Sequence, residues 1–252
     1  MIELKNLTTG YGEHIVARSI NSIIPEGNLI SLLGPNGVGK STLLRTLCAF
    51  QPAISGDIII NGTSLQELTQ AQLSRIISVV LTERLDVRAM TVHDLVSLGR
   101  SPYTGFWGRL DEEDERQVRQ AIDQVGISEL YEREIGTLSD GELQKAMIAK
   151  ALAQQTPIIL LDEPTAFLDF PSKVEMMRML HRLAHEMNKT IFLSTHDVEM
   201  ALQLSDQLWL MTAEGVHSGT PDELTADGSL ADFIHIEGIH FDSERKLFII
   251  DH

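Results

Sequence analysis

The stretch NLISLLGPNGVGKSTLLRTL, residues 28–47, decides the fold, because an apolar run, a glycine-rich turn and an amphipathic run follow one another in it. The turn, Gly34 to Ser41, matches the complete pattern of a phosphate-binding loop in its required setting between a strand and a helix. Glycines let the backbone curl so that successive N–H groups and the helix start face phosphate oxygens. A simple glycine-rich turn is the weaker alternative.

The residue types of this loop predict nucleotide binding. Lys40 is expected to reach the β and γ phosphates, and the hydroxyl of Ser41 is expected to bind Mg²⁺. The full set of expected nucleotide-binding residues in the loop is Gly34, Pro35, Asn36, Gly37, Val38, Gly39, Lys40, Ser41 and Thr42.

Composition bounds the class of protein. A chain of 252 residues with 43% hydrophobic and 22% charged content is typical of a globular protein with one core or two closely joined subdomains. It contains no apolar run of the roughly 18 residues that cross a bilayer, and its N-terminus lacks signal-peptide features, so a cytoplasmic location is expected. The net charge of −16 argues against nucleic acid or bare anionic lipid as the main partner, although most of this charge is explained by solubility alone.

The chain has a single cysteine, Cys48, so no internal disulfide can form. It lies in the apolar stretch TLLRTLCAF, which favours a buried structural thiol over a reactive one.

Alternation along the chain predicts an α/β fold. Short runs rich in Ile, Leu and Val alternate with amphipathic stretches, which indicates a mainly parallel sheet covered by helices. Asn61 and Gly62 in GDIIINGTSL are a turn signal suited to a small antiparallel sheet. Near the C-terminus, apolar residues flank the polar stretch DSERK, which could form a hairpin.

A helical insertion is expected between the two parts of this core. Val118, Ala121, Ile122 and Val125 form an apolar helical stripe, preceded by the acidic run Asp111 to Glu115. The acidic run favours a helix start through the macrodipole, and a dedicated binding role is the minor alternative.

These features divide the chain into a nucleotide-binding α/β core, an inserted helical subdomain and a C-terminal extension. The expected bounds are 1–82 with 157–220 for the core, 83–156 for the helical subdomain, and 221–252 for the extension.

The run IILLDEP places Asp162 and Glu163 at the C-terminal end of an expected buried strand, where open parallel sheets bind ligands. Asp162 is expected to hold Mg²⁺, and Glu163 to accept a proton from, or position, the water that attacks the γ-phosphate. Alone, an acidic strand end is more often a solvated turn, but the phosphate loop makes the catalytic interpretation strong.

Two further residues complete the expected site. His196 ends the apolar run in LSTHD and is placed to hydrogen-bond the γ-phosphate or the attacking water, although a lone histidine is usually structural. Tyr11, in TTGYGEH, could stack on adenine, and local packing of its ring is nearly as good an account.

The segment LSDGE precedes an expected helix and resembles the signature sequence of ABC ATPases, usually LSGGQ. With the motifs above and the FLD stretch at Phe167 to Asp169, the resemblance to the ABC ATPase family covers about residues 1–220. Within that family, Thr91 to Tyr103 looks like the helical region of ATPases that serve iron-siderophore, haem and cobalamin importers. The signature residues are Leu138, Ser139, Asp140, Gly141 and Glu142.

The resemblance implies a P-loop NTPase core with a small antiparallel β subdomain, an inserted helical subdomain, and ATP with Mg²⁺ as ligands. It implies a homodimer in which the phosphate loop of one chain and the signature of the other hold the same ATP, with Asp169 in the dimer loop. It also implies permease subunits, a substrate-binding protein in the full system, and membrane contact through the permease on the cytoplasmic face.

Three departures from the family pattern stand out. Thr82 occupies the position of a glutamine that meets Mg²⁺ and senses the permease; its hydroxyl could act through a water, Glu83 could substitute, or the link could be weakened. Asp140 and Glu142 add negative charge to the signature, and both side chains are expected to point away from the phosphate. Ala166 replaces a serine, so one hydrogen bond across the dimer is expected to be missing.

Other functions are possible within the same class. A soluble ABC ATPase that acts as an assembly factor, for example for iron-sulfur clusters, fits the chain length. DNA-repair or translation ATPases would need a long coiled coil, a second ATPase half or a basic surface. A nucleotide-binding module without catalysis is opposed by Glu163 and His196. The permease and the binding protein, rather than the ATPase, are expected to select the cargo.

Overall fold

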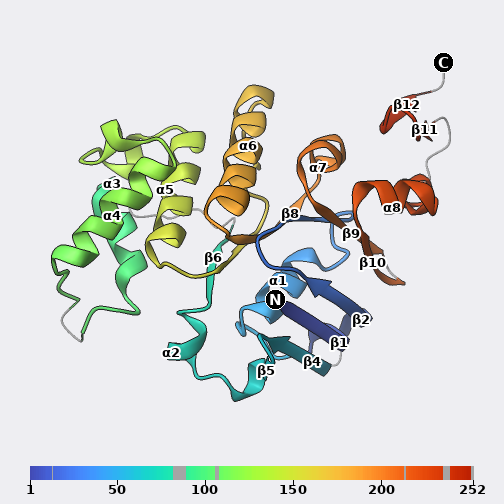
Figure 1. The fold of residues 1–252 in the computed structure, drawn as a ribbon, viewed down its shortest axis with the longest axis horizontal. Helices are drawn as coiled ribbons and strands as arrows, with labels where there is room; N and C mark the ends of the chain where they lie inside the picture. The colour runs from blue at the N-terminus through green and yellow to red at the C-terminus, as the bar shows by residue number, and fades with distance from the viewer. Residues whose placement is uncertain (13, 82–88, 106–107, 213, 235–238, 251–252) are drawn as a thin grey trace. The chain divides into compact units, whose positions relative to one another are not determined.

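The computed structural model describes residues 1–12, 14–81, 89–105, 108–212, 214–234 and 239–250. The chain forms two compact units (Figure 1). The first unit comprises Met1–Leu68 with Leu180–His252, and the second unit comprises Thr69–Met179. Each is described by itself.

The first unit contains a four-stranded sheet in the order β2-β1-β4-β5, and every neighbouring pair is antiparallel. Asn61 and Gly62 connect β4 to β5 with φ angles of 49° and 86°. Two successive positive φ angles suit the tight turn of a hairpin. The predicted antiparallel subdomain is therefore confirmed. The strands are β1 (Ile2–Tyr11), β2 (His14–Ile24), β4 (Ser55–Ile60) and β5 (Thr63–Ser64).

The same unit contains a mainly parallel group of strands. The completely buried strand β3 (Leu29–Leu33) lies between β8 (Thr190–Thr195) and β9 (Gln207–Thr212), and both neighbours are parallel to it. The short strand β10 (Gly215–Gly219) pairs antiparallel with β9. An apolar strand buried on both faces is typical of a parallel sheet covered by helices, and helices α1 (Lys40–Leu47) and α7 (Val198–Leu204) belong to this unit.

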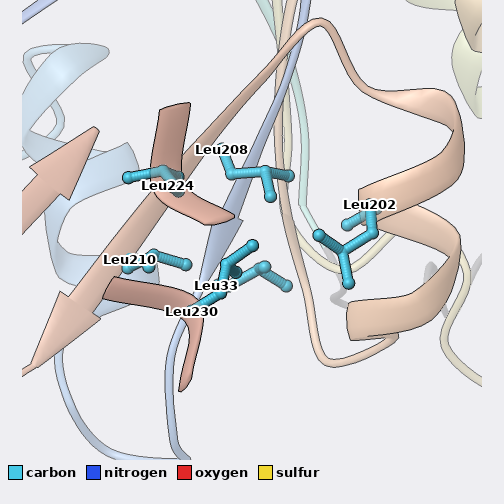
Figure 2. Packing of buried hydrophobic residues seen from close by; sticks show 7 residues of the cluster. Leu33, Leu202, Leu208, Leu210, Leu224 and Leu230 are labelled. Carbon is cyan, nitrogen blue, oxygen red and sulfur yellow. The ribbon is translucent and has the colours of Figure 1, made fainter. Parts of the chain in front are cut away.

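The C-terminal extension begins with helices α8 (Pro221–Ala226) and α9 (Ser229–Phe233), which pack on this sheet through a leucine cluster (Figure 2). Leu224 and Leu230 are buried together with residues of β3, α7 and β9. Strands β11 (Ile239–Asp242) and β12 (Leu247–Ile250) then form the antiparallel hairpin that the sequence suggested. Phe241 and Phe248 pair across it, with ring centroids 5.0 Å apart.

The second unit combines a parallel strand pair with helices. Strand β6 (Ile77–Val80) pairs with β7 (Ile158–Leu161), whose four residues are all buried. Helices α3 (Val92–Ser97), α4 (Glu112–Gln124) and α5 (Asp140–Ala153) pack on one another. The helix α2 (Gln70–Leu73) also belongs to this unit, and α6 (Phe170–Glu186) begins in it. The expected helical region is thus present.

The sequence signals for α4 are confirmed. All four residues of its predicted apolar stripe, Val118, Ala121, Ile122 and Val125, are buried. Asp111 is the N-cap and its carboxylate accepts from the Asp114 N–H at 2.8 Å, so the acidic run does start the helix.

A buried ion pair ties the helices of the second unit together. Arg100 is 3% exposed and donates from Nε to the Asp114 carboxylate at 2.9 Å. Its Nη1 donates to the Ala153 carbonyl at 2.7 Å and to Gln155 at 2.8 Å, and the guanidinium lies 4.1 Å from the Tyr103 ring centroid. The planar guanidinium therefore joins Asp114 of α4, Ala153 of α5 and the segment that follows α3 in one network.

Two smaller expectations can be compared with the structure. Cys48 is buried, as predicted, and burial raises the pKa of its thiol to about 12. Within the described part of the chain, no helix has the length and apolar character to cross a membrane.

Candidate nucleotide-binding and hydrolysis site

The phosphate loop joins the buried strand β3 to helix α1, as its sequence predicts. Gly37 and Gly39 have φ angles of 78° and 114°, a region that side-chain-bearing residues rarely adopt. At Gly39 an added Cβ would lie only 2.2 Å from the Val16 side chain. Glycine is therefore required at position 39 both by the backbone angle and by the space, and it lets the loop curl before the helix starts.

Lys40 lies over this loop. Its residue is 5% exposed, and Nζ donates to the carbonyl oxygens of Gly34 at 2.7 Å and Pro35 at 3.3 Å. These carbonyls hold the ammonium group over the loop, where the sequence predicts that phosphate binds. A phosphate oxygen would offer the same ammonium group a negatively charged acceptor in place of a neutral carbonyl, which adds charge attraction to the hydrogen bond.

His196 is brought to Lys40 by the pairing of two parallel strands. Leu33 at the end of β3 pairs with Thr195 at the end of β8, so the residues that follow both strands lie at the same edge. The Nδ1 atom of His196 lies 3.5 Å from Lys40 Nζ, although the two residues are 156 positions apart in the sequence. The predicted catalytic lysine and histidine therefore belong to one site.

Tyr11 lies at the C-terminal end of β1, next to the start of α1. The hydroxyl of Thr42 donates to the Tyr11 oxygen at 3.1 Å, while the tyrosine residue is 51% exposed. One end of the ring is thus fixed to the phosphate-loop helix and much of its surface is accessible. Stacking on adenine remains a prediction.

In the second unit, Asp162 and Glu163 follow the buried strand β7 as expected. Asp162 is 8% exposed and its N–H extends the strand ladder by donating to the Val80 carbonyl at 2.9 Å. Glu163 has a φ angle of 49°, and its carbonyl accepts from the Ala166 N–H at 3.0 Å, which closes a turn. A left-handed backbone at a residue other than glycine costs about 1–2 kcal/mol, and such strain is concentrated at functional sites.

The signature segment caps helix α5. Ser139 is the exposed N-cap, and its N–H and hydroxyl donate to the Glu142 carboxylate at 2.8 and 2.9 Å. These two bonds lower the pKa of Glu142. The expectation that Glu142 points away from the phosphate-binding patch is therefore corrected, because its carboxylate binds the very donors of Ser139. The physical reason is the capping box, which a glutamate completes as well as a glutamine. For the exposed Asp140 the expectation stays a prediction.

Arg133 was not identified from the sequence. Its guanidinium lies 3.7 Å from Glu142 and donates to the Thr137 carbonyl at 2.9 Å, which places a cation just before the signature. Only its position five residues before Leu138 could have drawn attention to it.

Two exposed aromatic residues lie around the start of α6, where the sequence drew attention to Phe167 only as part of the FLD stretch and did not draw attention to Phe170. Phe167 and Phe170 are 70% and 71% exposed, and they flank Asp169. Asp169 accepts from the Ser172 N–H at 3.0 Å and so begins α6, and hydrogen bonds from Ser172 lower the pKa of Asp169. The sequence FLDF contained the signal, since two large apolar residues beside a helix start are unusual on a solvated surface.

The structure thus brings Tyr11, the phosphate loop and His196 together in the first unit, and it places the acidic strand end, the signature and Asp169 at defined positions in the second unit. Thr82, the possible additional Mg²⁺ ligand, and its neighbour Glu83 lie outside the described residues.

A strand, a glycine-rich loop and a helix that together hold a lysine at a phosphate cradle define the class of P-loop nucleoside triphosphatases. Comparison with known protein families identifies a narrower group within this class. The sequence profile of the family described as ABC transporter matches residues 17–166 of this chain. The chain belongs to the ABC transporter family, as an ATP-binding subunit that hydrolyses ATP.

Two curated relatives illustrate this membership. An uncharacterized ABC transporter ATP-binding protein of Methanocaldococcus jannaschii is 41% identical over 211 residues, covering 84% of this chain and 73% of the relative. An iron(3+)-hydroxamate import ATP-binding protein of Bacillus subtilis is 36% identical over 204 residues, covering 81% of this chain and 76% of the relative. The family match and the named relatives give no support to the alternative function as a soluble assembly factor.

Solved structures agree with the fold. A metal-chelate type ABC transporter in an inward-facing conformation aligns with a TM-score of 0.82 at 25% identity, covering 99% of this chain and 95% of that chain. A bacterial ABC transporter cassette in dimeric form aligns with a TM-score of 0.75 at 27% identity, covering 88% of this chain and 99% of that chain. The predicted fold class is confirmed.

Proposed function

We propose that this chain forms a homodimer on the cytoplasmic face of the membrane and energises a permease that imports an iron-siderophore, haem or cobalamin. The observation that carries the cargo class is the similarity to an iron(3+)-hydroxamate import ATP-binding protein over 81% of this chain. The metal-chelate type transporter that covers 99% of this chain supports the same class. A substrate-binding protein that delivers the chelate completes the proposed system.

In the proposed reaction, water attacks the γ-phosphorus of ATP. The bond from that phosphorus to the bridging oxygen breaks, and ADP leaves with the electron pair. Glu163 accepts the proton of the attacking water. Lys40 exchanges the Gly34 carbonyl for phosphate oxygens, and His196, whose ring reaches Lys40 at 3.5 Å, donates to the γ-phosphate.

The donor set fits Mg²⁺, which prefers oxygen ligands. Ser41 offers a hydroxyl on the exposed face at the start of α1, and Asp162 offers a carboxylate at the end of β7. When bound, Mg²⁺ supplies neutralisation of the phosphate charge. The role of Thr82 belongs to the same proposal.

Dimerisation is supported by the exposed signature. Ser139 stands at the N-terminus of α5, a helix of 14 residues whose positive end favours an anion. In the proposed sandwich this end receives the γ-phosphate bound to the partner. The exposed side chains of Phe167 and Phe170 around Asp169 provide apolar surface that a partner copy would bury. Ala166 removes one hydroxyl from that contact.

The permease is proposed to dock on the segment Thr91 to Tyr103. This segment contains α3 and exposes Leu98 and Tyr103 by 49% and 37%, while the buried Arg100 network holds its shape. A rigid element with exposed apolar side chains is suited to transmit a movement between proteins.

The test of the function has two parts. Glu163→Gln should lower the turnover of ATP at least about a hundredfold, because the general base is lost, and should leave a stable dimer in saturating ATP, seen by light scattering. Glu129→Gln, an exposed glutamate of the second unit, is the control and should turn over ATP normally. A monomeric Glu163→Gln protein in saturating ATP contradicts the sandwich. Failure of the chain to co-purify with any permease from its own cells contradicts the transport role.

A further inference from the structure

Outside the nucleotide site, the first unit contains a group of three side chains of metal-ligating type. His181 and His185 lie on one face of α6, one helical turn apart, and Asp206 directly precedes β9. Ligand atoms of all three residues lie within 4.8 Å of one another. The residues are accessible rather than buried, with exposed side-chain fractions of 42% for His185 and 27% for Asp206.

This group is distinct from the nucleotide site. Asp206 accepts a hydrogen bond from the N–H of Leu29, the first residue of β3, whereas the phosphate loop begins at Gly34, after its last residue. A strand rises about 3.3 Å per residue, so the five residues of β3 separate the two places by roughly 16 Å. The group therefore lies at the N-terminal end of strand β3, and the phosphate loop lies at the C-terminal end of the same strand.

The distances suit a four-coordinate ion. Bonds of about 2.0–2.1 Å in tetrahedral geometry place neighbouring ligand atoms roughly 3.4 Å apart. His185 Nε2 already lies 3.1 Å from Asp206 Oδ2, and the ring centroids of His181 and His185 are 4.2 Å apart. The imidazole rings are accessible, and their rotation would narrow the remaining gap.

An ordinary ion pair explains only part of this arrangement. The contact of His185 with Asp206 involves one imidazole, and it does not account for the second, whose ring centroid lies 4.2 Å from that of His185. Two neutral imidazoles and a carboxylate instead match the ligand preference of zinc. The Leu29 N–H, at 2.7 Å from Asp206 Oδ2, orients the carboxylate in the way that second partners orient metal ligands.

We propose that His181, His185 and Asp206 bind one divalent transition-metal ion, with Zn²⁺ as the preferred ion, and that water completes its coordination. The ion connects the last turns of α6 to the start of β9. Because the ligands are assembled only in the folded chain, binding stabilises the first unit by mass action. The overall charge of −16 favours the approach of a cation.

The test uses the full chain, stripped of metal and free of nucleotide. Zn²⁺ is titrated in competition with a chromophoric chelator, and Co²⁺ is titrated as a spectroscopic probe of the ligand geometry. His181→Ala and His185→Ala should each weaken zinc binding at least about tenfold and remove the cobalt absorption bands of a four-coordinate site. Asp206→Asn, which retains an acceptor for the Leu29 N–H, should weaken binding in the same way.

A matched control is available in the same unit. His217 pairs with Asp227 at 2.9 Å, and the metal-ligand clusters found among the described residues do not include it. His217→Ala should therefore bind Zn²⁺ like the unchanged chain, and Zn²⁺ should raise the unfolding temperature of both. Zinc affinity that is unaltered in His181→Ala and His185→Ala, or an unchanged chain that binds no Zn²⁺ in the competition assay, would overturn the proposal. Should His185→Ala fail to fold, His181→Ala decides alone.

Discussion

The Glu142 carboxylate accepts hydrogen bonds from both the N–H and the hydroxyl of Ser139, at 2.8 and 2.9 Å, and the Glu142 N–H returns one to the Ser139 oxygen at 3.3 Å. The Glu142 carboxylate, which caps helix α5, therefore places a negative charge beside Ser139. In the proposed sandwich, the N–H and hydroxyl of Ser139 are the groups that donate to a phosphate of the partner's ATP. In the proposed sandwich, capping and phosphate binding would compete for the same serine.

Removing this charge should strengthen the ATP-dependent dimer. Glu142→Gln keeps an acceptor for Ser139 but removes an exposed charge, whose effect near a helix N-terminus is about 0.3–1 kcal/mol. Because each dimer contains two signature segments, we expect the ATP-dependent association constant to rise about three- to thirtyfold, measured by light scattering over a range of protein concentrations. Glu223→Gln is the control, because Glu223 caps α8 through Thr220 with the same geometry. Association that is unchanged or weaker in Glu142→Gln would contradict the competition.

Substitution of Gly39 should destabilise the chain more than substitution of another glycine with a positive φ angle. In Gly39→Ala the new side chain lies at a strained φ angle of 114° and collides with Val16. We therefore expect the free energy of unfolding to fall by about 1–3 kcal/mol more than the backbone angle alone would cause. Gly126→Ala carries a φ angle of 72° with no atom within 4 Å of the new Cβ, and it should show the backbone cost alone, about 1–2 kcal/mol. Urea unfolding measures both. Equal losses would show that the contact with Val16 relaxes freely.

Breaking the buried pair in the second unit should be costly. Arg100→Ala leaves the Asp114 carboxylate buried without its guanidinium partner, which costs about 3–5 kcal/mol of the free energy of unfolding. Arg116→Ala removes a fully exposed pair with Glu113 within α4 and should lower the free energy of unfolding much less than Arg100→Ala. Thermal and urea unfolding compare the two variants. If Arg100→Ala lowered the free energy of unfolding no more than Arg116→Ala, the stabilising role of the Arg100 network would be contradicted.

The single thiol should be inert in the folded chain. Burial raises the pKa of Cys48 to about 12, so the thiolate, which is the reactive form, is scarce at neutral pH. A folded-state pKa above the unfolded one stabilises the chain fully below pH 9, and this contribution is lost as pH rises from about 9 toward 12. A chromogenic thiol reagent at pH 8 should label Cys48 only after unfolding in urea. Rapid labelling of the folded chain would disprove its burial.

Much of the site was predictable because its signals are local. The phosphate loop needs glycines and a lysine at fixed spacing, and Asn61 with Gly62 specifies a turn without help from distant residues. Asp162 and Glu163 were predictable for the same reason, since an apolar run that ends in two acidic residues identifies the end of a buried strand. The expectation for the orientation of Glu142 was wrong, because it considered the repulsion between this carboxylate and a phosphate and not the capping of α5 by the same carboxylate.

The sequence by itself determined the pattern of the phosphate loop, which strands are buried and where helices α1, α4 and α5 begin, because backbone angles, apolar periodicity and capping act over a few neighbouring residues. The tertiary structure alone decided that His196 reaches Lys40, that Arg100 finds Asp114 and Ala153, and that His185 meets Asp206. The pairing of parallel strands and the packing of helices bring together residues far apart along the chain, and no local pattern records those distances.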